Sequence, residues 1–298
     1  MTDRLLVLSD EYEIVIDAVA EARSVFRRLA GEGGFAITHV GCARRVDAKL
    51  MEIEEARQLA ETLTWWLSLL RGERTAPILL RGMQDRAVQW ELWQPRTVQS
   101  WTGPKSWLPA NLDDTTVTNS LGVIFQSLHN LDASDDRESV HRLIDLYNQS
   151  QHNEHTGAIL VMAQAGLELA SWLDCHGDVL PGDGHNAAGR LRCALKDAKI
   201  SPVIPETLEV LRSEPTKGDS GQIDGPEAIT GFRNSVIHPE LDERFSSPTS
   251  QLQCLQLSIR YLELLILHRL GYLGRMKDRT DVVFTDAFFA EADVPWAS

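Results

Sequence analysis

Hydrophobic residues recur every three or four positions over most of the second half of the chain, which is the spacing of an amphipathic helix. The widest apolar stripe lies in residues 250–273, and a stripe of this width is typical of a helix in the core of a bundle. Strand patterns nearly vanish beyond residue 110. The remaining helices are predicted at residues 116–130, 136–149, 154–176, 185–199, 205–213 and 225–238.

The first 110 residues show a mixed pattern. Residues 13–20 alternate partly like a strand, but residues 17–29 fit one helical face better, so we predict a helix there. A second helix is predicted at residues 47–70, with Gly72 as its stop. Strands are predicted at residues 35–40, 77–82 and 87–93.

A loop dense in proline and tryptophan, residues 95–109, marks the expected domain boundary. With 298 residues and 43% hydrophobic content, the chain is long enough for two cores. The predicted fold class is therefore α+β, with an N-terminal mixed module at residues 1–112 and an all-α bundle at residues 113–298. The tryptophans of the first module are expected to pack in its core rather than to stack on bases. They are Trp65, Trp66, Trp90, Trp93, Trp101 and Trp107.

The charge is strongly acidic and unevenly distributed. The formal net charge is −14; residues 1–110 hold 14 Lys and Arg against 15 Asp and Glu, and residues 111–298 hold 15 against 28. This balance argues against a protein that neutralises nucleic-acid phosphates over its whole surface. A polyanionic substrate must instead be held locally or by a partner protein.

Neither a metal site nor a disulfide framework is predicted. The four cysteines, Cys42, Cys175, Cys193 and Cys254, are scattered without a CxxC pair, and we expect them to be small buried hydrophobic residues in a reducing compartment. His152 and His155 lack a third ligand in the sequence and are expected to be solvated. The acidic start of the chain does not resemble a signal peptide, and the apolar run 261–267 is too short to cross a bilayer. A soluble cytoplasmic protein that needs no cofactor is the resulting expectation.

The segment 232–239 holds the candidate chemistry. Arg233, Asn234 and His238 lie at the end of a predicted helix, and Pro239 should break that helix close to the histidine. Arg233 and His238 are separated by five positions, about 140° around an ideal helix. They converge if the helix frays, or if two copies face each other across a twofold axis. The structural alternative is that these residues only cap the helix end and form a salt bridge there.

This segment resembles the HEPN superfamily, whose signature is Arg, a polar residue and then His after a spacer of four to six residues. Here the signature is formed by Arg233, Asn234 and His238, with a four-residue spacer. Glu168, within Leu-Glu-Leu, is similar to the acidic position of an earlier bundle helix in that family, and the apolar run 262–267 is similar to its final helix. The resemblance covers roughly residues 113–275.

The resemblance implies an endoribonuclease of prokaryotic defence or toxin–antitoxin systems that cleaves RNA without a metal ion. In that chemistry the ribose 2′-hydroxyl attacks the adjacent phosphate, His238 moves protons and Arg233 stabilises the charge on the phosphoryl oxygens. Asn234 would orient the phosphate or the imidazole, and Glu168 would anchor Arg233. The resemblance also implies a homodimer, with the catalytic pairs near the twofold axis.

Two other functions compete with this hypothesis. The chain could be a non-catalytic sensor that keeps the HEPN scaffold, or an adaptor or antitoxin-like subunit whose basic partner supplies the grip on RNA. The acidic charge of the helical half favours these alternatives.

Overall fold

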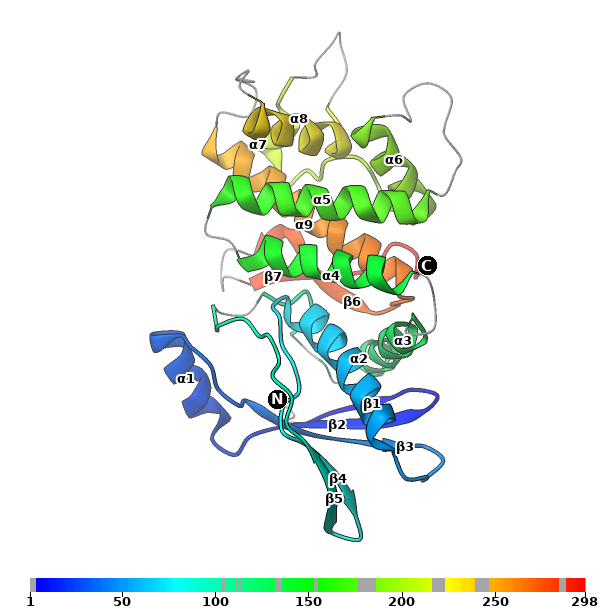
Figure 1. Ribbon diagram of the computed structural model, residues 1–298. Coiled ribbons are helices and arrows are strands. Elements are labelled where there is room, and N and C mark those ends of the chain that lie inside the picture. Colours follow the sequence, from blue (N-terminus) through cyan, green and yellow to red (C-terminus); the bar gives the residue numbers. More distant parts are fainter. Residues whose placement is uncertain are drawn as a thin grey trace. The chain divides into compact units, whose positions relative to one another are not determined.

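The computed structural model describes residues 4–102, 105–110, 112, 114–131, 136–152, 155–175, 186–215, 223–238, 247–283 and 288–297. The chain divides into two compact units. The N-terminal unit comprises Met1–His141 together with Leu270–Gly274, and the C-terminal unit comprises Arg142–Arg269 together with Arg275–Ser298. Figure 1 labels their elements.

A three-stranded antiparallel sheet in the order β1-β2-β3 opens the N-terminal unit. Its elements are β1 (Arg4–Leu8), β2 (Tyr12–Ala18), α1 (Ala22–Glu32) and β3 (His39–Arg45). The helix predicted at residues 17–29 is therefore wrong at its start: the alternating residues form β2, and the helix begins only at Ala22. The strand predicted at residues 35–40 is displaced toward β3, where it pairs with β2.

Two helices, α2 (Ile53–Arg71) and α3 (Thr115–Leu131), pack against each other in the same unit. Trp66 is fully buried between them and donates its indole N–H to the Leu121 carbonyl at 3.1 Å. Gly72 ends α2 in the left-handed conformation, with φ 73°, which confirms the predicted stop. Gly122 lies so close to the Leu8 carbonyl that a side chain there would displace β1.

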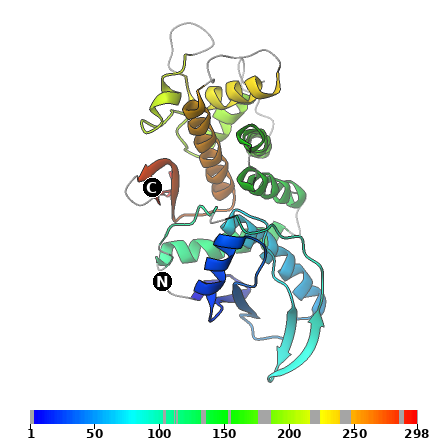
Figure 2. The same cartoon turned by 90° about the vertical axis from the view of Figure 1, so that its left-hand side faces the viewer.

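The hairpin of β4 (Leu80–Gln84) and β5 (Ala87–Leu92) confirms the two strands predicted around the turn near residue 85. Asp85 and Arg86 turn the chain with positive φ angles of 50° and 66°, as a two-residue hairpin loop requires. The hairpin projects from its unit (Figure 2). The tryptophans of the N-terminal unit differ in burial. Trp66 and Trp107 are buried as predicted, but Trp93 is 69% exposed, so the prediction of core packing is wrong for Trp93.

Helices dominate the C-terminal unit, as predicted. They are the C-terminal part of α4 (Arg137–His152), α5 (Thr156–Asp174), α6 (Ala187–Asp197), the short α7 (Glu209–Arg212), α8 (Gly225–Ile237) and α9 (Pro248–Arg269). Helix α9 packs against α5, α6, α7 and α8 (Figure 1). Its residues from Tyr261 to Leu267 are all buried, which confirms the expected core helix.

A hairpin of β6 (Arg275–Val283) and β7 (Phe288–Asp293) follows α9 and packs on it. The prediction that residues 113–298 are all helical is therefore wrong in this segment. A buried ion pair holds the hairpin: Arg279 Nη2 lies 2.8 Å from Glu263 Oε1, and the Tyr147 hydroxyl donates to the same oxygen at 2.8 Å. Burial, and secondly the charge of Glu263, raises the pKa of Tyr147, so the phenol stays a donor.

The compact units do not divide at residues 112 and 113. Helix α3 belongs to the N-terminal unit, where it packs on β1 and α2, and the division falls within α4 between His141 and Arg142. The division into a module at residues 1–112 and a helical domain at residues 113–298 remains a prediction.

Helix α5 is long and apolar enough to cross a membrane by length and composition alone. In the structure its buried residues, which include Leu160, Leu167 and Leu173, pack among α6, α8 and α9. A half-exposed carboxylate, Glu168, lies in the same helix. These features are typical of a core helix in a water-soluble bundle.

Candidate active site

Helix α8 carries the candidate motif, and its start is fixed by side-chain capping. Asp224 is the N-cap: its carboxylate accepts the backbone N–H of Glu227 at 2.9 Å and binds Arg192 at 2.6 Å. Pro226 lies in the first turn, as predicted. The register of α8, and hence the direction in which its motif residues project, is therefore set two turns before Arg233.

His238 ends α8. Its backbone N–H donates to the Asn234 carbonyl at 3.0 Å, which completes the last helical turn, and its φ and ψ of −103° and 144° are already extended. The predicted helix break at the histidine is thus confirmed. Pro239, to which we attributed the break, lies outside the described residues. The His238 side chain is exposed to solvent.

Arg233 is held from two directions. Its Nη1 donates to the Asn234 Oδ1 at 3.0 Å, and its Nη2 lies 3.8 Å from the Glu168 Oε1 on α5. The side chains of Arg233 and Glu168 are 31% and 35% exposed. The predicted anchoring of Arg233 by Glu168 is therefore present, with a guanidinium that water still reaches.

The polar contacts continue from Glu168 into α5. Gln164, four residues earlier, is only 2% exposed, and its Nε2 amide donates to Glu168 Oε1 at 3.3 Å. Its Oε1 is buried without a hydrogen-bond partner among the described residues. Gln164 was not predicted as a site residue; its spacing of four residues from Glu168 within an apolar helix is the signal that indicates it.

The arrangement can do chemistry on an anion. A guanidinium offers five N–H donors in a planar fork, and the two contacts of Arg233 leave donors able to meet phosphoryl oxygens. An exposed imidazole follows Arg233 by little more than one helical turn, and imidazole is the side chain best suited to proton transfer near neutral pH. The structure thus brings Arg233, Asn234 and Glu168 together. A groove shared by Arg233 and His238 remains a prediction.

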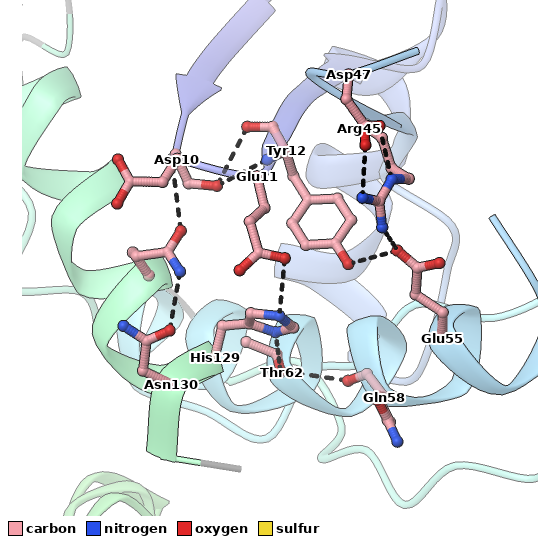
Figure 3. Close-up of polar contacts among 12 residues, drawn as sticks. Asp10, Glu11, Tyr12, Arg45, Asp47, Glu55, Gln58, Thr62, His129 and Asn130 are labelled. Atoms are coloured by element: carbon pink, nitrogen blue, oxygen red, sulfur yellow. Dashed lines mark hydrogen bonds and ion pairs between the residues drawn. The ribbon is translucent and has the colours of Figure 1, made fainter. Parts of the chain in front are cut away.

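Another cluster of titratable side chains lies in the N-terminal unit (Figure 3). The Tyr12 hydroxyl donates to Glu55 at 2.9 Å, and Arg45 binds both Glu55, at 2.6 Å, and Asp47, at 2.8 Å. Burial, and secondly the hydrogen bond to Glu55, raises the pKa of Tyr12, while the hydrogen bond from Arg45 lowers the pKa of Asp47. The charged groups satisfy one another, so we assign them to bracing β2 and β3 against α2.

The same region contains His129 near the end of α3. Its Nε2 lies 3.9 Å from Glu11 Oε2, and its Nδ1 lies 3.5 Å from the Thr62 hydroxyl (Figure 3). Its ring stacks on Phe125 with the ring centroids 6.1 Å apart. An imidazole that contacts Glu11 in the β1–β2 turn, Thr62 on α2 and Phe125 on its own helix is typical of a structural histidine. We therefore place the candidate chemistry on α8.

Comparison with known proteins covers both units. The sequence-family model of the YopA C-terminal domain matches residues 133–289, and the family model of the YopA central domain matches residues 1–104. The chain belongs to the YopA family. It is 28% identical over 297 residues to the SPbeta prophage-derived uncharacterized protein YopA of Bacillus subtilis (strain 168). That alignment covers 96% of this chain and 64% of the relative's length. No solved structure shows a significant match.

The candidate site lies wholly within the part that matches the YopA C-terminal domain, since Glu168, Arg233, Asn234 and His238 all fall between residues 133 and 289. The pattern around β1 to β5 corresponds to the YopA central domain.

Proposed function

We propose that the YopA C-terminal domain of this chain is an endoribonuclease of the HEPN type, which cleaves RNA without a metal ion. The observation that carries the proposal is the guanidinium of Arg233, held by Glu168 and Asn234 but still open to water, shortly before the exposed His238 at the end of α8. The signature residues of the resemblance thus occupy one helix of an α-helical bundle.

The proposed reaction is a transesterification. The ribose 2′-hydroxyl loses its proton and attacks the adjacent phosphorus, the bond from phosphorus to the 5′-oxygen breaks, and that oxygen takes up a proton. His238 moves protons in this sequence, and Arg233 binds the phosphoryl oxygens as negative charge gathers on them. Glu168 is a positioning residue, because it acts through Arg233. The products are a 2′,3′-cyclic phosphate and a 5′-hydroxyl.

A homodimer is part of the proposal. Arg233 and His238 differ by about 140° around α8, so one helix does not present both side chains on a single face. Two copies related by a twofold axis would let the arginine of one copy meet the histidine of the other. We further propose a cytoplasmic protein of prokaryotic defence or toxin–antitoxin function, whose RNA substrate is held locally or with a protein partner.

The test is RNA cleavage by the purified full chain in EDTA. We expect the wild type to cleave total RNA and His238→Ala to be slower by about 10²–10⁴-fold, the usual contribution of general acid–base catalysis. His39→Ala is the matched control, since His39 is an exposed histidine of the N-terminal unit and this variant should cleave normally. Cleavage that is lost in EDTA and restored by Mg²⁺ would contradict the metal-free mechanism.

A second function is favoured by the charge distribution. Residues 111–298 carry 28 acidic side chains against 15 basic ones, which suits a subunit that binds a basic protein partner rather than RNA alone. Under this alternative, an antitoxin-like adaptor, wild type and His238→Ala would both leave RNA intact. The same cleavage assay therefore separates the two functions.

A further inference from the structure

A group of three metal-ligating side chains lies in the C-terminal unit, apart from the α8 motif. Cys175 is the C-cap of α5, and Cys193 and Asp197 lie on α6. The two thiol sulfurs and one carboxylate oxygen of Asp197 all lie within 4.8 Å of one another. The three residues form what we name the thiol cluster.

The fold, rather than sequence spacing, assembles this cluster. Cys193 and Asp197 are four residues apart and therefore lie on one face of α6, with the sulfur 4.0 Å from the Asp197 Oδ2. The end of α5, which packs on α6, brings Cys175 to the same face. The Cys175 sulfur also lies 3.9 Å from the Arg190 carbonyl oxygen, one turn earlier on α6. Cys175 and Cys193 are thus far apart in the sequence but close together in the fold.

The side chains of the thiol cluster are accessible to a metal ion from solvent. Cys175 and Cys193 are partly exposed and Asp197 is exposed, whereas Cys254 alone among the four cysteines is buried as expected. A neighbouring acid, Asp174, is already matched by Arg269 at 2.6 Å. Among the residues that the structure describes, Asp197 forms no ion pair with a Lys, Arg or His side chain.

We propose that Cys175, Cys193 and Asp197 bind a zinc ion. Two thiolates and one carboxylate are a borderline-soft donor set, which suits Zn²⁺ better than the oxygen-preferring Mg²⁺ or Ca²⁺. Zinc–sulfur bonds of about 2.3 Å in a tetrahedral site place the ligand atoms roughly 3.5–3.8 Å apart. The cluster therefore has to contract by about 1 Å, which side-chain rotations can supply. A fourth position stays open to water or another ligand.

The ion would fasten the C-terminal end of α5 to α6. Glu168, the anchor of Arg233, lies two helical turns before Cys175 on the same helix, so the bound ion would stiffen the element that positions the candidate site. The inference does not depend on RNA cleavage, because the ligand set is complete without Arg233 or His238.

The test is a cobalt titration of the full chain, stripped of metal and kept reduced. Co²⁺ takes up zinc sites and absorbs visibly when thiolates bind it, so we expect one equivalent to produce thiolate-to-cobalt absorption that Zn²⁺ then abolishes. Cys175→Ser and Cys193→Ser should lose this absorption. Cys42→Ser, which changes an exposed cysteine on β3 outside the cluster, should keep it.

Asp197→Asn gives a second measurement that does not depend on the cysteines. Because Asp197 is exposed, this variant should fold normally and bind Co²⁺ more weakly than the wild type. Wild-type thermal stability should rise with added Zn²⁺, and that of the Cys193→Ser variant should not. Absence of cobalt absorption, equal absorption in the Cys193→Ser variant, or a Cys175–Cys193 disulfide in the reduced preparation would overturn the proposal. None of these outcomes bears on RNA cleavage, which is measured separately.

Discussion

Replacing Arg233 with alanine separates a catalytic role from a structural one. In the structural alternative, Arg233 only pairs with Glu168, and its removal lowers the stability of the fold. In the proposed function, the guanidinium binds the phosphoryl oxygens, and its removal lowers the rate of RNA cleavage. The geometry of the pair allows the two effects to be assigned different sizes.

The stability effect should be small. The Arg233–Glu168 separation is 3.8 Å and both side chains are about one-third exposed, so the pair contributes about 0.2–1 kcal/mol. Glu168 would remain accessible to water after the change, so no buried charge is left behind. For a chain of this length, a loss of 1 kcal/mol lowers the Tm by about 2–4 °C.

The catalytic effect should be far larger. Removing one preorganised donor to a developing oxyanion typically slows the reaction about 10²–10³-fold, equivalent to about 2.7–4 kcal/mol. A stability loss below about 1 kcal/mol leaves a chain of ordinary stability almost fully folded, and therefore does not produce such a rate change. Cleavage of a defined RNA and thermal unfolding, measured on the same preparations, distinguish the two roles.

Arg212→Ala is the matched control. Arg212 lies in the same unit, is 35% exposed against 31% for Arg233, and pairs with Glu206 at 3.3 Å. It should show the same small change in Tm and no change in cleavage. The reasoning is refuted if Arg233→Ala cleaves at the wild-type rate, or if it unfolds many degrees below Arg212→Ala.

Two further predictions concern the scaffold and the dimer. Glu263→Ala should cost about 3–5 kcal/mol in urea unfolding, because it removes the carboxylate that balances the buried charge of Arg279. The exposed Glu206→Ala should cost about 0.5 kcal/mol or less, and similar costs for the two variants would show that the buried ion pair is not needed. The inactive Arg233→Ala and His238→Ala variants should regain activity when they are mixed and refolded together, if each site takes one residue from each copy. About half of the dimers are then mixed, and one of the two sites in each mixed dimer holds both native residues, so about a quarter of the wild-type sites are restored. No restored activity would contradict the shared dimer site.

The helices were predictable because their apolar faces are continuous. Segments such as 116–130 and 225–238 bury one side against neighbouring helices, so periodicity alone places α3 and α8 within a few residues. The cap of α8 was also predictable, since Asp224 and Pro226 act locally on the first turn.

The β6–β7 hairpin was not predictable in this way. Residues 275–283 read Arg-Met-Lys-Asp-Arg-Thr-Asp-Val-Val, which lacks apolar alternation, because β6 is held on α9 by charged groups. Arg279 meets Glu263, and Arg260 meets Asp278 at 2.9 Å. Glu263 lies within the apolar run 261–267, and its partner lies 16 residues away on a strand that was not predicted.

The candidate sites also differ in how far the sequence predicts them, because some of their contacts are local and others depend on tertiary packing. Arg233, Asn234 and His238 fall within one short segment and can be found from sequence, while the contact with Glu168 depends on how α5 packs against α8. The thiol cluster is wholly tertiary, because Cys175 reaches Cys193 only through the packing of α5 on α6. Tertiary packing also explains His152, which we expected to be solvated. It is half-buried, and its Nδ1 is buried without a hydrogen-bond partner among the described residues.

The chemical structure of the RNA ends produced by the wild-type chain in EDTA is the most direct measurement. Mass spectrometry of the products should find 2′,3′-cyclic phosphates and 5′-hydroxyls, made at a rate that the His238→Ala change suppresses. Products with 3′-hydroxyl and 5′-phosphate ends, or intact RNA after prolonged incubation, would contradict attack by the ribose hydroxyl at the α8 site.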